Sequence, residues 1–364
     1  MITNSDGIFN KTKIGVDDYN QRITAEMDEL TKWLGILEKN FYPLGKIVFN
    51  ENKTFSGEVE GDYNNPIIPR GFYPVNDNGA AWGSNDGYKN GLIIEDVNGN
   101  QYVWVPVDGD IVKLEQIEWN DANGKFFGYG DKLSDYTESI PDEIKQSISK
   151  NKGFYIARFE AGISNEMKLA IEKNKGKEIT VLPEAEDTTN TYGNGNYMPV
   201  SKQGAIVWNN IAFNDANGNG ALKVVNNLYH EDDINYGAVS TLSYGACWDA
   251  ALKFISAYSV GENGYEVYPI DSNGMGNYNG TNGADTFTGI ANCGAVREFG
   301  QKNIYDMAGN VLEWTLETYE SRLVGRSGYY GCTASEFPAA GRNGGGEPSM
   351  SLDSLGFRVM LYIK

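Results

Sequence analysis

The sequence contains one histidine and three cysteines in 364 residues, which limits the chemistry that it can perform. The single histidine, His230, cannot form a multi-histidine zinc site, and its isolation argues against a histidine-bearing nucleophilic triad. It lies in Tyr-His-Glu-Asp-Asp, a polar stretch typical of an exposed loop. The cysteines, Cys247, Cys293 and Cys332, are far apart and form no CxxC pair, so we expect reduced thiols in a chain that folds in the cytoplasm.

Long apolar runs and clusters of basic residues are also missing. No run of about 18 apolar residues could span a membrane, and no N-terminal segment resembles a signal peptide. The formal net charge is −19, and no basic cluster could neutralise a row of phosphates, so we expect no nucleic-acid partner. An acidic surface is compatible with cation binding, with solubility or with a basic partner.

The sequence has no Walker loop, no HExxH zinc motif and no GxSxG nucleophile elbow. The stretch Asp215–Gly220 fits the first half of an EF-hand loop, but its twelfth position is Asn226 instead of a bidentate glutamate. We therefore interpret it as a turn, and interpret Asp121-Ala122-Asn123-Gly124 in the same way.

Apolar residues make up 40% of the chain, enough for a substantial core, and the 44 glycines and 23 tyrosines favour many turns and short elements. The length allows one large domain with an appendage, or two domains. Asn98-Gly99 predicts a hairpin turn between two strands. The two hairpin strands are Gly91–Glu95 and Gln101–Val107. Further along the chain, the pattern predicts a strand at Phe154–Glu160, helices at Trp208–Phe213 and Ser243–Tyr258, and one long loop at Gly261–Gly294.

The strongest helix signal spans Val16 to Asn40 and ends before Pro43. Its apolar residues keep a three-four spacing over about three heptads. Two interpretations stay open. The helix lies on its own domain, or it forms a short coiled coil that makes a homo-oligomer or attaches the protein to a larger assembly.

The stretch Asn303–Trp314 combines two carboxylates, two amides and a tryptophan, and predicts a short strand whose start carries oxygen ligands. It contains Gly309-Asn310-Val311-Leu312-Glu313-Trp314, which resembles the GNVWEW signature of the formylglycine-generating-enzyme/sulfatase-modifying-factor family, with Leu312 in place of Trp. Three further stretches resemble the same family: Ile68–Tyr73, Phe154–Glu160 and Ala339-Ala340-Gly341-Arg342 running to Leu355-Gly356-Phe357-Arg358.

The resemblance runs from about Ile67 to Lys364 and implies a C-type-lectin-like fold, an α+β body with low regular secondary structure. It also implies a structural calcium site. The side chains of Asp306 and Glu313 and the carbonyls of Gly309 and Val311 match its ligands. The alternative is that the two carboxylates only accept hydrogen bonds from nearby backbone.

The family's oxidase chemistry requires two cysteines five positions apart, which hold copper as thiolates. Cys332 is near the first position, but Phe337 occupies the second, so we expect no copper and no oxidase activity.

The region of about 324–357 alternates small or fixed residues with aromatic and small polar ones, a composition found in antibody-like binding surfaces. It also resembles the variable proteins of diversity-generating retroelements, found in phages and bacteria. An ordinary glycine-rich loop is the alternative. The candidate ligand-binding residues are Tyr329, Tyr330, Cys332, Ser335, Glu336, Phe337, Asn343, Gly344, Glu347, Ser349 and Asp353.

We therefore expect an N-terminal helical segment for oligomerisation or attachment, residues 1–60, followed by one C-type-lectin-like domain, residues 61–364. The expected function is non-enzymatic binding of a protein or glycan ligand on a cell surface by a retroelement-diversified protein of phage or prophage origin. The expected location is a phage virion or the bacterial cytoplasm, without membrane insertion. A glycan-binding tail or surface adhesin of fixed sequence is the alternative, and a formylglycine-generating-type oxidase is disfavoured.

Overall fold

The computed structural model describes residues 62–77, 80–84, 86–182, 189–257, 267–279 and 289–364, and the paired short strands β1 (Val48–Phe49) and β2 (Phe55–Ser56). The helix predicted over Val16–Asn40 lies outside the described residues, as does most of the segment 1–60. Parts of the predicted loop Gly261–Gly294 also lie outside them. In the part of the chain that is described, no helix is both long and apolar enough to cross a membrane.

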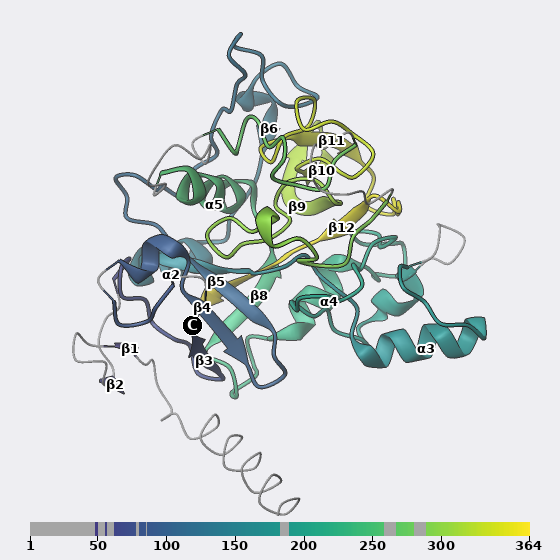
Figure 1. Ribbon diagram of the computed structural model, residues 1–364, viewed down its shortest axis with the longest axis horizontal. Helices are drawn as coiled ribbons and strands as arrows, with labels where there is room; N and C mark the ends of the chain where they lie inside the picture. The colour runs from purple at the N-terminus through teal and green to yellow at the C-terminus, as the bar shows by residue number, and fades with distance from the viewer. Residues whose placement is uncertain are drawn as a thin grey trace, which may run out of the picture. The chain divides into compact units, whose positions relative to one another are not determined.

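A six-stranded antiparallel sheet forms the centre of the fold, in the order β3-β4-β5-β7-β13-β8 (Figure 1). The strand β13 follows the second sheet in the chain, yet it lies between β7 and β8. The sheet therefore joins segments that are about 200 residues apart, such as Met360 of β13 opposite Ile156 of β7. The strands are β3 (Phe72–Val75), β4 (Ile93–Asp96), β5 (Gln101–Pro106), β7 (Gly153–Ala157), β8 (Ala238–Leu242) and β13 (Val359–Ile363).

Both faces of this sheet are buried, because alternate residues of its strands enter two different apolar clusters. On β5, Tyr102 and Trp104 belong to one cluster, and Val103 and Val105 to the other. Successive side chains of a strand point to opposite faces, so a strand without polar alternation requires cover on both sides.

Helices supply that cover. The helices α3 (Asn165–Lys175) and α4 (Ala221–Leu228) pack on the cluster of Trp104, and α2 (Asp142–Asn151) and α5 (Gly245–Ala257) on the cluster of Val103. Figure 1 shows α3 and α4 on the other side of the sheet from α5. Within the described ranges, 3-10 turns lie between these elements at η1 (Gly87–Asn90), η2 (Leu133–Asp135), η4 (Thr189–Asn194) and η5 (Arg297–Phe299).

The second sheet has the order β11-β10-β9-β12 and carries the C-terminal region of interest. Only the pairing of β12 with β9 is parallel, and β6 pairs with the far end of β9. The chain thus runs up β9, back along β10, out into a loop and back along β11. The strands are β6 (Tyr136–Thr137), β9 (Leu312–Tyr319), β10 (Arg322–Arg326), β11 (Arg342–Gly346) and β12 (Leu355–Phe357).

Most local predictions are confirmed. The hairpin of β4 and β5 turns at Gly99, whose φ of 84° suits glycine, and the predicted helix Ser243–Tyr258 is α5. Asp215 accepts hydrogen bonds from the backbone of residues 217 and 219, as expected for a turn. The side chain of His230 is 55% exposed, in agreement with a loop position.

The helix predicted over Trp208–Phe213 is wrong. This segment is buried but has no helical structure. The backbone N–H of Trp208 donates to Ala161 O at 2.8 Å, and that of Asn210 to Leu352 O at 3.0 Å, so partners distant in the chain satisfy the backbone. Asn210 has a φ of 52°, which is incompatible with a helix.

Candidate functional site

Four fully buried charged side chains form the frame under the C-terminal region: Arg326, Arg342, Asp249 and Glu317. Arg326 donates to Asp249 at 2.6 Å and to Glu317 at 3.1 Å. Arg342 donates to Glu317 at 2.7 Å and also contacts Asp249. Each arginine therefore bridges both carboxylates, and the two positive charges balance the two negative ones. We refer to these residues as the ionic frame.

The ionic frame is stable because its members compensate one another. Burial alone disfavours a charged carboxylate, but the guanidinium groups of Arg326 and Arg342 outweigh this effect and lower the pKa of Asp249. Backbone and side-chain donors from Ile117 and Trp119 complete the hydrogen bonding of Asp249. The frame fixes α5, β9, β10 and β11 to one another, because one charged residue comes from each.

The candidate ligand-binding residues follow the frame arginines in the chain. They differ in exposure. Tyr329, Tyr330, Phe337, Asn343 and Gly344 are half-buried, and Ser335, Glu336, Glu347, Ser349 and Asp353 are exposed.

The structure brings the two predicted segments together at one point. The Tyr330 hydroxyl donates to Asp353 Oδ2 at 2.9 Å, and the rings of Tyr329 and Tyr330 meet edge to face at 5.8 Å. Asn343 is close to the same end of the strands, since its amide donates to Ser327 O at 2.9 Å. We call Tyr329, Tyr330, Asn343 and Asp353 the tyrosine face.

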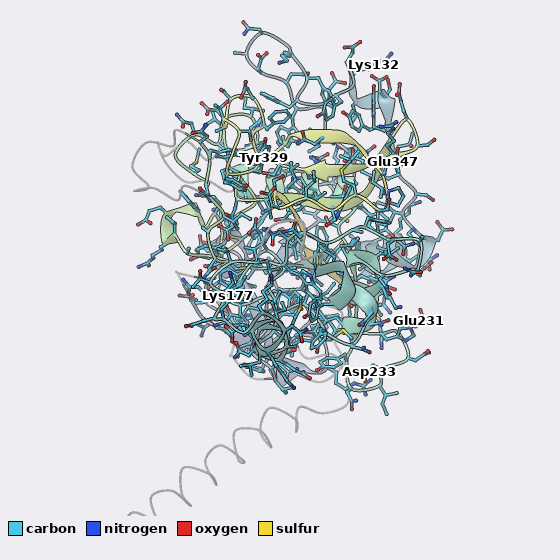
Figure 2. All side chains as sticks on the ribbon, turned by 90° about the vertical axis from the view of Figure 1, so that its right-hand side faces the viewer. Lys132, Lys177, Glu231, Asp233, Tyr329 and Glu347 are labelled. Atoms are coloured by element: carbon cyan, nitrogen blue, oxygen red, sulfur yellow. The ribbon has the colours of Figure 1, made fainter. Side chains whose placement is uncertain are left out.

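Glu347 is not part of the tyrosine face. In the pairing of β10 with β11, Arg326 lies opposite Arg342, and Leu323 opposite Gly346. Glu347 therefore leaves at the other end of the hairpin, roughly 13 Å away along the strands, where it pairs with the exposed Arg322. Figure 2 shows Tyr329 and Glu347 on either side of the C-terminal strands.

Cys332 differs from the expectation of a ligand contact, because its side chain is buried at 7% exposure. Its sulfur lies in a tight turn, 3.1 Å from both the backbone nitrogen and the carbonyl oxygen of Tyr329. Burial raises the pKa of this thiol, which disfavours the thiolate.

A second buried cluster surrounds the four residues expected to bind calcium. Both oxygens of Glu313 accept hydrogen bonds from Arg358, at 2.6 Å and 2.9 Å. Asp306 accepts from the backbone of Gly294 at 2.6 Å. Glu160 accepts from the Asn310 amide at 2.6 Å. Asp306 therefore accepts from the backbone, as in the alternative stated from the sequence, whereas Glu313 accepts from the guanidinium of Arg358 instead.

The charges of this cluster do not balance, since three buried carboxylates face the single guanidinium of Arg358. Burial raises the pKa of Asp306 to about 6 and also raises the pKa values of Glu160 and Glu313. A buried excess of negative charge is neutralised by protons or by a cation.

The donor set can be compared with what calcium requires. Among the described residues, no group of three or more Asp, Glu, His or Cys side chains is placed to hold a metal ion. A calcium ion would use the carbonyls of Gly309 and Val311 together with Asp306, and Glu313 would share its oxygens with Arg358. Gly309 has a φ of 74°, and a Cβ there would lie 2.4 Å from Asn277 O, so only glycine fits. Calcium therefore stays a prediction.

Arg342 belongs to one of the motifs that the sequence indicates, whereas Asp249 and Glu317 were not predicted, and Glu160 was predicted only as the end of a strand. One signal was present for Asp249. It lies within Ala246–Leu252, an otherwise apolar stretch of α5, where a lone carboxylate requires a buried partner.

No protein-family model matches the sequence, and no curated protein matches it. Solved structures do resemble the chain. Treponema denticola variable protein 1 shares 14% identity over 73% of this chain and 97% of its own, with a TM-score of 0.34. PvdO from Pseudomonas aeruginosa shares 15% identity over 74% and 98%, with a TM-score of 0.39.

The Major Tropism Determinant U1 variant shares 10% identity over 88% of this chain and 72% of its own, with a TM-score of 0.30. All three TM-scores are below 0.5, and all three identities are 15% or lower. The helices and sheets described above form an α+β body, as expected from the sequence. No activity or ligand follows from the comparisons.

Proposed function

We propose that the chain is a non-enzymatic binding protein that presents the tyrosine face to a protein or glycan ligand on a cell surface. The observation that carries the proposal is the contact between Tyr330 and Asp353, which joins the two predicted ligand-binding segments. Tyrosines offer a large contact area and lose little conformational entropy on binding. A surface that is already ordered by the frame loses little further entropy when it binds.

The division between frame and face supports a diversified surface. Frame residues such as Arg326 and Arg342 are fully buried, whereas Tyr330 is half-buried and Asp353 is exposed. Substitution at an exposed position away from buried networks usually changes stability by less than about 0.5 kcal/mol. The face can therefore change in sequence while the frame keeps the fold.

The thiol chemistry supports a binding role over an oxidase. Cys332 has a raised pKa, and Phe337 occupies the position of the second thiolate. All three cysteines are buried and free, so none is paired with another. Copper(I) requires thiolate ligands, which this arrangement disfavours.

The first experiment is to sequence the genome around the gene and search for a reverse transcriptase and a near-copy of the DNA that encodes Val324–Phe357. We expect a near-copy whose differences are mainly at adenines. We expect those differences at codons of exposed or half-buried residues and never at Arg326 or Arg342. Absence of both elements, or differences spread equally over buried residues, contradicts a diversified surface and leaves a fixed-sequence adhesin.

A second experiment separates binding from folding. The purified chain is applied to a panel of bacterial cells, and the Tyr329→Ala and Tyr330→Ala variants are compared with the wild type. We expect both variants to lose cell binding while they stay folded, with a loss of stability no larger than about 1.5 kcal/mol, the size of one hydrogen bond. Unfolding of both variants would show instead that the tyrosines belong to the core.

A further inference from the structure

A cavity of about 470 Å³ lies at the start of α3, and the C-terminal region contributes none of its lining residues. The lining comes from residues 163–168, residues 179–180, residues 200–206 and Asn292. Its volume is within the range of small-molecule pockets, about 300–1,000 Å³. The tyrosine face plays no part in it, so this site is independent of the proposed function.

The floor of the cavity is apolar and firmly held. Ile163, Ile179 and Ile206 line it, each with less than a tenth of its surface exposed. The backbone N–H of Ile163 donates to Ile206 O at 2.9 Å, and Gly162 exchanges two hydrogen bonds with Val200, at 2.8 Å and 2.9 Å. The floor is therefore part of the folded core and requires little rearrangement to receive an apolar group.

The rim carries positive charge, which is unusual in a chain whose net charge is −19. Lys168 and Lys202 line the cavity, and no Asp or Glu does. The charge of Lys168 is shared with Glu172 at 3.4 Å and Glu178 at 3.9 Å. Lys202 forms no salt bridge with any residue that the structure describes, so no carboxylate neutralises its charge, and its Nζ lies next to Gly99, just outside the lining.

We propose that this cavity binds a small organic carboxylate. The apolar part of the ligand lies on the isoleucine floor, and its carboxylate accepts hydrogen bonds from Lys202 and, to a smaller extent, Lys168. Amides and hydroxyls of the rim, such as those of Asn165 and Thr180, supply further polar contacts. An inorganic anion lacks the apolar part, and a neutral amide lacks the charge, so neither satisfies both halves of the site.

The test is isothermal titration calorimetry on the full chain with straight-chain carboxylates from acetate to octanoate. We expect affinity to rise about fourfold with each added methylene, because each one leaves water for the apolar floor. We expect octanamide, the neutral analogue, and inorganic phosphate to bind at least tenfold more weakly than octanoate. Equal binding of octanoate and octanamide, or no octanoate binding at millimolar concentration, overturns the proposal.

Matched variants locate the binding. Lys202→Gln removes the rim charge and should weaken octanoate binding about tenfold, as expected for one charge-assisted hydrogen bond. Lys177→Gln removes an exposed lysine outside the lining (Figure 2) and should leave binding unchanged. Thr180→Trp places an indole at the exposed rim and should block octanoate without disturbing the core. Equal effects of Lys202→Gln and Lys177→Gln, or unchanged binding by Thr180→Trp, would reject this cavity as the site.

Discussion

The hydroxyl of Tyr330 donates a hydrogen bond to Oδ2 of Asp353, a residue 23 positions later in the chain, and the two oxygens are 2.9 Å apart. The bond closes the loop that leaves β10 against the segment that enters β12. Burial and the neighbouring carboxylate raise the pKa of Tyr330 to about 12, so its hydroxyl stays a donor at neutral pH.

A double-mutant cycle measures the strength of this bond. We expect Tyr330→Phe and Asp353→Asn each to lower the free energy of unfolding by about 0.5–1.5 kcal/mol, because each removes or weakens one hydrogen bond. Once either partner is changed, the second substitution should have little further effect. Urea denaturation at neutral pH checks this, and strictly additive losses would show that the two side chains do not interact.

The ionic frame should be far more sensitive. Arg342→Met leaves Asp249 and Glu317 buried with one guanidinium between them, and we expect a loss of about 3–5 kcal/mol. Arg322→Met is the matched control, because Arg322 lies on the neighbouring strand with its side chain 55% exposed and pairs with an exposed glutamate. Its expected loss is about 0–1 kcal/mol. Similar losses for both variants in denaturant titrations would contradict a stabilising frame.

The stability of the protein should depend on the protonation of Glu138. Its carboxylate accepts hydrogen bonds from the first backbone N–H groups of α5, Gly245 at 2.6 Å and Ala246 at 2.9 Å. Burial nevertheless raises its pKa from 4.5 to about 7, helped by the negative charges of Glu317 and Asp249.

A raised carboxyl pKa means that the folded state binds the proton more tightly than the unfolded state. The resulting stability is present at low pH and is lost as the pH rises through about 7. Between pH 5 and pH 8, we expect the free energy of unfolding of the wild type to fall by about 3 kcal/mol more than that of the Glu138→Gln variant. Parallel pH profiles of the two proteins, measured by thermal unfolding, would contradict this.

The unbalanced cluster around Asp306 makes the calcium prediction testable. We expect calcium, added at pH 7.5 to protein treated with a chelator, to raise the melting temperature, since a bound ion stabilises the folded state in proportion to ln(1 + [L]/Kd). Asp306→Asn should remove that response, and magnesium should give less of it because it prefers a smaller, octahedral site. An unchanged melting temperature at millimolar calcium would show that protons alone neutralise the cluster.

The sequence predicted what depends on neighbours in the chain. The turn at Gly99, the turn at Asp215 and the helix α5 follow from local hydrogen bonds and local propensity. The signature strand was also predicted, because the alternation of Leu312 to Trp314 is itself a local pattern.

Partners distant in the chain were not predictable in the same way. Asp249 meets Arg326 across 77 residues, and Glu160 meets Asn310 across 150. Carboxylates are too common in this sequence for such a pair to be chosen from the residues alone. The false helix at Trp208–Phe213 has the same origin, because its backbone bonds go to Ala161 and Leu352. The division of the predicted ligand residues into two ends of a hairpin required the register of β10 and β11.

The position of β13 has a consequence for any variation in the segment before it. This strand follows the 324–357 region in the chain and inserts between β7 and β8, where it is paired on both sides. Folding must therefore bring together parts of the chain about 200 residues apart before the sheet is complete, a topology that slows folding. If a substitution in the loop changes the direction of the chain that follows, β13 does not insert between β7 and β8, and the central sheet stays incomplete. The central sheet and the loop before β13 are therefore coupled, so that a substitution in the loop can affect the folding of the whole domain.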